Sequence, residues 1–145
     1  MTTAIVSKMN ELKLFGMSNA YQTSCEMNQH YTADELVNYL VEAEWLERQN
    51  RLQKGRIRQA KFRYEATVSE IDFAANRNLD KNTIMRLADC SFVQKAENII
   101  ITGKTGAGKS YLASALGHQA CVKGVKVLYA NTTRLMSELK MSRAD

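Results

Sequence analysis

The 145-residue sequence contains no proline and only three cysteines, and it has no long run of apolar residues. Cys25, Cys90 and Cys121 are far apart and form no C-x-x-C pair, so the sequence predicts neither a disulfide framework nor a zinc site. No segment approaches the roughly 18 apolar residues of a transmembrane helix, and the N-terminus lacks the basic and apolar regions of a signal peptide. We therefore expect a cytoplasmic protein without a membrane role.

The segment 103–110, which contains three glycines, carries the most specific motif in the sequence. It matches the phosphate-loop pattern G-x-x-x-x-G-K-[ST], in which glycines let backbone N–H groups point inward around a phosphate. The motif predicts a nucleoside triphosphate site, with Lys109 at the β- and γ-phosphates and Ser110 on a Mg²⁺ ion. The predicted binding residues are Gly103, Lys104, Thr105, Gly106, Ala107, Gly108, Lys109 and Ser110.

The flanking segments favour a phosphate loop over the alternative, a glycine-rich turn without a ligand. Residues 98–102 form a β-branched apolar run that predicts a buried strand leading into the loop. Residues 110–122 repeat apolar side chains at helical spacing, and residues 125–130 predict a second strand. Strand, loop, helix and strand together predict a βαβ unit whose helix points its N-terminus at the phosphates.

The sequence before residue 98 predicts only helices. Thr32 and Glu35 form a capping box, and a helix is expected from there to about Phe62, with Gly55 bending or dividing it. Apolar residues recur in it at helical spacing and predict one apolar stripe with Trp45 at its edge: Leu36, Tyr39, Leu40, Ala43 and Leu46. Other helices are expected at 3–12, 17–27 and 81–89, the last capped by Asp80, and one after Thr132 or Thr133. The fold class is therefore α + α/β: a helical N-terminal region, 1–90, and an incomplete P-loop domain with a parallel sheet, 91–145.

One stretch of the N-terminal region is basic and contains no acidic residue. Its cations are Arg48, Arg51, Lys54, Arg56, Arg58, Lys61 and Arg63. Such a run attracts polyanions and is suited to contact a DNA backbone through its phosphates. A basic helix face that only meets solvent gives the same pattern, and no base-reading motif is present, so both interpretations stay open.

The order of these features resembles the insertion-sequence ATP-binding proteins, the IstB-like transposition helper ATPases of the AAA+ class. The resemblance covers essentially the whole chain, and the motifs upstream of the phosphate loop make it more specific than the loop alone. The matching tracts are Ala43-Glu44-Trp45, the arginine-rich helix, Ile71-Asp72-Phe73, residues 97–103 leading into the loop, the small residues 113–121 after it, and Ser142-Arg143-Ala144-Asp145.

The resemblance implies a protein that binds ATP and Mg²⁺, self-associates on double-stranded DNA and delivers target DNA to a partner transposase. The bacterial helicase loaders have similar ATPase cores and are the alternative within this class. They differ in what they bind, because a loader is expected to engage a helicase and single-stranded DNA.

The sequence departs from the family in one respect. The acidic motif at a strand end, the sensor residues and the arginine finger find no match in it, so we expect a truncated chain that hydrolyses ATP negligibly. A third hypothesis follows, in which the chain is a non-catalytic remnant that binds DNA or partner subunits through its N-terminal helices.

Overall fold

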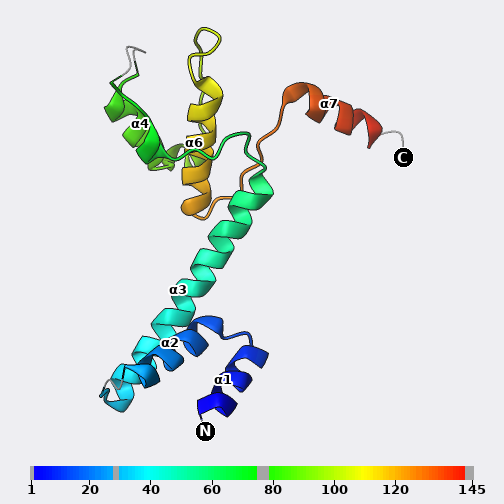
Figure 1. Ribbon diagram of the computed structural model, residues 1–145. Coiled ribbons are helices and arrows are strands. Elements are labelled where there is room, and N and C mark those ends of the chain that lie inside the picture. Colours follow the sequence, from blue (N-terminus) through cyan, green and yellow to red (C-terminus); the bar gives the residue numbers. More distant parts are fainter. Residues whose placement is uncertain (1, 28–29, 75–78, 143–145) are drawn as a thin grey trace. The chain divides into compact units, whose positions relative to one another are not determined.

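The computed structural model describes residues 2–27, 30–74 and 79–142, and these divide into two compact units at Lys54 and Gly55 (Figure 1). The first unit contains α1 (Thr2–Glu11), α2 (Phe15–Glu26) and most of α3 (Ala33–Ala60). The second contains the end of α3, the 3₁₀ turn η1 (Val68–Glu70), α4 (Lys81–Ala88), α5 (Ser91–Gln94), α6 (Lys109–Val122) and α7 (Thr132–Met141). None of the described helices is long and apolar enough to cross a membrane.

The local signals for helix ends are confirmed almost throughout. The Thr32 amide donates to Glu35 Oε2 at 2.8 Å and the Glu35 amide donates to Thr32 Oγ1 at 3.3 Å, so the predicted capping box begins α3. Asp80 caps α4 by accepting from the amides of Asn82 and Thr83. The α3 helix passes Gly55 without a break and ends at Ala60, two residues before the predicted end.

Two expectations about helix details are wrong or incomplete. The cap of α7 is Asn131, not Thr132 or Thr133, because its side-chain oxygen accepts from the amides of the second and third helical residues. The short helix α5 and the turn η1 lie where no helix was predicted. The segments 28–31 and 67–78, for which no helix is expected, and the matching tract 142–145 fall partly outside the described residues.

Glu44 links α2 to α3 in the first unit. The residue is buried, with 6% exposed, whereas the residues beside it on α3 are half-buried or exposed. Its carboxylate accepts the Gly16 amide at 2.9 Å and the Met17 amide at 3.3 Å, and Arg48 Nε lies 2.7 Å from its other oxygen. Glu44 thereby satisfies free N–H groups in the first turn of α2, where a negative charge is also favoured by the helix dipole. The hydrogen bonds from the first turn of α2 to Glu44 thus hold α2 against α3, where the sequence predicted only an apolar stripe.

That predicted stripe is confirmed in part. Leu36, Tyr39, Leu40 and Ala43 are half-buried, whereas Leu46 is exposed. Trp45, expected at the edge of the stripe, is 58% exposed. The close approach of α2 depends on Gly16 instead, because a Cβ there would lie 2.4 Å from the Ala43 carbonyl oxygen.

We expect the first unit to lose stability in acid through Glu44. Burial raises the pKa of this carboxyl, but the Arg48 side chain and the amides of Met17 and Gly16 outweigh it and hold the pKa below the usual 4.5. The resulting stabilisation is present above pH 4.5 and is lost as the pH falls through the lowered pKa. Unfolding by urea followed through the fluorescence of Trp45, the only tryptophan, measures this; Glu44→Gln should remove that part of the pH dependence. An unchanged pH profile in Glu44→Gln would contradict the assignment.

The second unit is built around α6. Ala66, Ile71, Ile84 and Ala115 form its buried cluster, which brings η1, α4 and the phosphate-loop helix together. Phe62 lies against Gly117 on α6, where a Cβ would come within 2.6 Å of the ring. The segments that flank the phosphate loop are therefore attached to a packed helical core.

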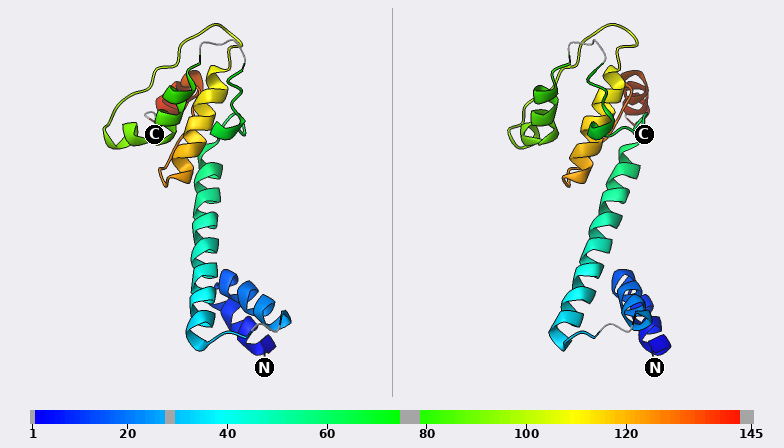
Figure 2. Two further views of the ribbon diagram at one scale, coloured as in Figure 1. Left: turned by 90° about the vertical axis from the view of Figure 1, so that its left-hand side faces the viewer. Right: turned by 60° about the vertical axis from the view of Figure 1, so that its left-hand side comes forward.

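The predicted parallel sheet is not confirmed, because the described residues contain no β-strand. Residues 98–102 and 125–130 are irregular and are drawn as coil in both views of Figure 2. A strand needs a neighbour to satisfy its backbone groups, and these two segments do not pair with each other. The Tyr129 amide instead donates to the carbonyl of Ala60 at the end of α3, at 2.8 Å.

Their side chains nevertheless alternate as in strands. Ile99, Ile101, Val125 and Val127 are half-buried and border, with α6, an apolar groove of about 260 Å³. On the opposite faces Ile100 is 85% exposed and Leu128 is 67% exposed, beside polar residues such as Lys126. Each segment therefore covers α6 with one face and leaves one large apolar side chain of the opposite face in solvent. The compact units divide between Lys54 and Gly55, which does not test the predicted domain boundary between residues 90 and 91. That boundary stays a prediction.

Candidate nucleotide-binding site

The loop 103–110 has the backbone conformation that its glycines were predicted to permit. Gly106 has φ of +80° and Gly108 has φ of +85°, values at which side chains are strained. The Ala107 amide donates to the Lys104 carbonyl at 3.2 Å, which closes a tight turn between them. The loop is thus folded without any β-strand beside it.

Lys109 lies across this loop. Its Nζ donates to the Gly103 carbonyl at 2.9 Å and to the Lys104 carbonyl at 2.7 Å. The ammonium group is consequently held against the backbone of the predicted phosphate loop. Its contact with the β- and γ-phosphates stays a prediction of the motif.

The helix after the loop begins without a capping side chain. Gly108 is its N-cap residue, in the left-handed conformation, and has no side chain to accept from the first amides of α6. Those N–H groups and the positive end of the helix dipole together form a site suited to an anion. Ser110, the predicted Mg²⁺ ligand, lies in the first turn of the same helix and is half-buried.

A cavity of about 470 Å³ adjoins the loop. One part of its wall is the loop itself, including Gly103, Gly108 and Lys109. The other part is apolar: Ile101, Tyr111 and Leu112 flank the loop in the chain, whereas Ile71 and Leu79 were not predicted to lie there. Sequence reasoning missed this wall because Ile71 and Leu79 are distant in the chain and reach the loop only through the packing of η1 and α4 on α6. A polar loop beside an apolar wall is typical of a small-molecule site.

The basic tract lies on α3 and just beyond it, and its members have different surroundings. Arg48 is paired with Glu44, and the guanidinium of Arg51 lies 5.8 Å from the centre of the Phe15 ring, so both take part in packing the first unit. In the second unit Arg56 is half-buried and lies near Cys121, where burial raises the pKa of the thiol and the charge of Arg56 lowers it. Lys54, Arg58, Lys61 and Arg63 are exposed.

A comparison with known families shows the family to which the chain belongs. The profile of the family described as "IstB-like ATP binding protein" matches residues 7–145, nearly the whole chain. The chain belongs to this family. Membership makes it a P-loop protein of an ATP-binding family, and it makes ATP the ligand that the loop and its helix are suited to hold.

Three curated relatives point in the same direction. Protein y4pL of Sinorhizobium fredii, named as an insertion sequence ATP-binding protein, is 34% identical over 97% of this chain and 58% of its own length. The corresponding protein of insertion sequence IS1162 from Pseudomonas fluorescens is 33% identical over 100% of this chain and 64% of its own. Protein Rv3427c of Mycobacterium tuberculosis, likewise named for an insertion sequence, is 31% identical over 98% and 57%. The chain thus spans about three fifths of the length of these relatives.

Proposed function

We propose that this IstB-like chain is the nucleotide- and DNA-binding part of a transposition helper, which acts on double-stranded target DNA together with a partner transposase. The observation that carries the proposal is the phosphate loop: a turn closed by two left-handed glycines, crossed by Lys109, at the uncapped end of α6. The names of the relatives, which link ATP binding to insertion sequences, supply the context.

In the proposed complex, the loop amides and Lys109 hold the triphosphate of ATP at the end of α6. The base lies against the apolar wall of the cavity, where Ile71, Leu79 and Tyr111 provide a surface for an aromatic ring. Lys109 exchanges its two loop carbonyls for phosphate oxygens, which are better acceptors because they carry charge.

Mg²⁺ is proposed to bind at Ser110. The described residues contain no group of three His, Cys, Asp or Glu side chains that could hold a metal ion on their own. Mg²⁺ in nucleotide sites does not need one, because it takes one or two protein oxygens and completes its shell with phosphate oxygens and water. The hydroxyl of a serine in the first turn of α6 fits that requirement.

The segments 98–102 and 125–130 are proposed to become strands of a parallel sheet when neighbouring strands are supplied. Their alternating burial, the exposed Ile100 and Leu128, and the apolar groove between them and α6 support this proposal. Strands of parallel sheets are covered on both faces, so apolar side chains on both faces are expected of them.

DNA binding is assigned to the exposed part of the basic tract. Lys54 and Arg58 are four residues apart and therefore lie on one face of α3, where both are exposed. They are separated from acidic residues along the helix, so a phosphate backbone can approach them without repulsion. Self-association and the transposase partner belong to the same proposal, with family membership as their support.

The test is duplex binding at a series of salt concentrations. In Lys54→Gln/Arg58→Gln, affinity should fall similarly for unrelated duplex sequences, and the slope of log K against log salt should flatten by about 0.9 per lost phosphate contact. The charge-matched control is Lys95→Gln/Lys126→Gln, which removes two exposed cations outside the tract. Equal affinities and slopes for the two double variants would refute the assignment, and stronger binding of single strands would favour the helicase-loader alternative.

A further inference from the structure

The second unit contains a small basic cleft at the end of α3 that the sequence alone does not reveal. It has a volume of about 240 Å³ and lies between the residues that follow α3 and the first turns of α7. Lys61 and Arg63 line one side, and Arg134, seventy residues further along the chain, lines the other. The hydrogen bond from the Tyr129 amide to the Ala60 carbonyl, at 2.8 Å, ties the two sides together.

The three cations are available to a ligand to different degrees. The side chain of Lys61 forms no hydrogen bond or ion pair with any described residue, and its backbone has φ of +56° at the residue that follows α3. The guanidinium of Arg63 lies 5.4 Å from the centre of the Tyr64 ring, a contact that leaves its N–H donors unused. Both cations therefore keep their donors for an anion.

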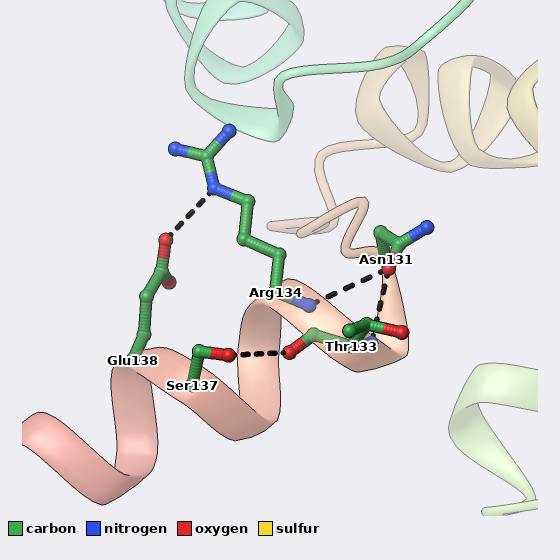
Figure 3. A network of polar contacts seen from close by, with 5 residues as sticks. All are labelled: Asn131, Thr133, Arg134, Ser137 and Glu138. Carbon is green, nitrogen blue, oxygen red and sulfur yellow. Dashed lines mark hydrogen bonds and ion pairs between the residues drawn. The ribbon is translucent and has the colours of Figure 1, made fainter.

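Arg134 is positioned by α7 itself. Its amide is bonded to the cap residue Asn131, and its Nε donates to Glu138 Oε1 at 2.9 Å (Figure 3). This pair fixes the guanidinium so that its side chain rises from α7 toward the chain at the end of α3 (Figure 3). The two terminal nitrogens have no partner among the described residues, and the side chain is 78% exposed. A guanidinium held by Nε presents its remaining donors as a fork suited to phosphate oxygens.

We propose that Lys61, Arg63 and Arg134 bind a phosphodiester group of double-stranded DNA, which extends the DNA-binding surface from α3 to α7. This inference rests on the proposed DNA-binding function. Three cations against one carboxylate leave the cleft positive, and Lys61 and Arg63 continue the basic tract directly. Glu138 has two effects in this arrangement: it orients Arg134, and it weakens the attraction of the cleft for a phosphate.

Duplex binding of the whole chain, measured against salt concentration, tests the cleft. Arg134→Gln should weaken binding several-fold, irrespective of sequence, and flatten the slope of log K against log salt by about 0.9. Glu138→Gln should strengthen binding, because it removes the only carboxylate of the cleft while keeping an oxygen for Arg134 Nε. Arg86→Gln is the matched control: Arg86 is exposed on α4 outside the cleft, and its side chain donates to Thr83 Oγ1 at 3.4 Å.

The outcomes separate this inference from the proposed function. If Lys54→Gln/Arg58→Gln weakens binding while Arg134→Gln behaves like Arg86→Gln, the cleft is refuted and the proposed function stands. If Glu138→Gln weakens binding as much as Arg134→Gln does, the pair serves only to shape α7 and the cleft is also refuted. A wild-type chain without affinity for duplex DNA would refute both.

Discussion

Replacing Lys109 with alanine is expected to weaken binding of Mg²⁺-ATP by about 100-fold or more. A hydrogen bond to a charged group contributes about 1.5–3 kcal/mol, and Lys109 is placed to make such bonds to two phosphates, where each 1.4 kcal/mol is a factor of ten in affinity. The change also removes the two bonds from Nζ to the carbonyls of Gly103 and Lys104, so the loop loses its internal brace. In the proposed complex Lys109 gives up these two carbonyls for phosphate oxygens, so the expected loss of affinity rests on the phosphate contacts, which are the stronger bonds.

Titration calorimetry with the wild type, Lys109→Ala and Lys95→Ala measures this effect. Lys95 is an exposed lysine at the end of α5, outside the cavity beside the loop, and its loss controls for the general effect of one positive charge. We expect Lys95→Ala to bind ATP as the wild type does. Equal affinity of Lys109→Ala and the wild type would mean that the loop does not hold the triphosphate in the proposed manner.

The features that were predictable from the sequence are those fixed by neighbouring residues. The capping box of Thr32 and Glu35, the Asp80 cap and the turn at Gly106 and Gly108 each depend on a few consecutive residues whose chemistry admits few alternatives. The phosphate loop and its helix were found for the same reason. Local rules therefore predicted the turn and the helix that make up the candidate site.

The features that were not predictable depend on residues distant in sequence. A sheet requires pairing partners, and apolar alternation in 98–102 and 125–130 could not say whether any would be present. A glutamate in a helix is usually exposed to solvent. Glu44 is buried only because α2 packs on α3 at Gly16. Arg134 joins Lys61 only because the chain around Tyr129 returns to the end of α3. In each case the packing of separate elements decided the environment.

Gly16→Ala is expected to be the most damaging small substitution in the first unit. A Cβ at this position would lie 2.4 Å from the Ala43 carbonyl oxygen and 2.7 Å from the Glu44 Cα, and backbone atoms of α3 cannot rotate away as a side chain can. The α2 helix must therefore separate from α3, and the carboxylate of Glu44 then loses the amides of Gly16 and Met17. Two hydrogen bonds to a charged group are lost, at about 1.5–3 kcal/mol each, and together they approach the whole stability of a small unit.

Gly55→Ala is expected to have the opposite effect on stability in the same chain. Gly55 lies inside α3, and no atom comes within 4 Å of a Cβ built there, so alanine should stabilise the helix by about 0.5–1 kcal/mol. Urea unfolding compares both variants with the wild type; it is followed through Trp45 in the first unit for Gly16→Ala and through helical circular dichroism for Gly55→Ala, because Gly55 belongs to the second unit. If Gly16→Ala unfolds at the same urea concentration as the wild type, α2 does not pack on α3 through Glu44. The two glycine-to-alanine changes are expected to alter stability with opposite signs. A general effect of adding a methyl group cannot explain this difference, because of these two positions only Gly16 places the methyl group against another helix.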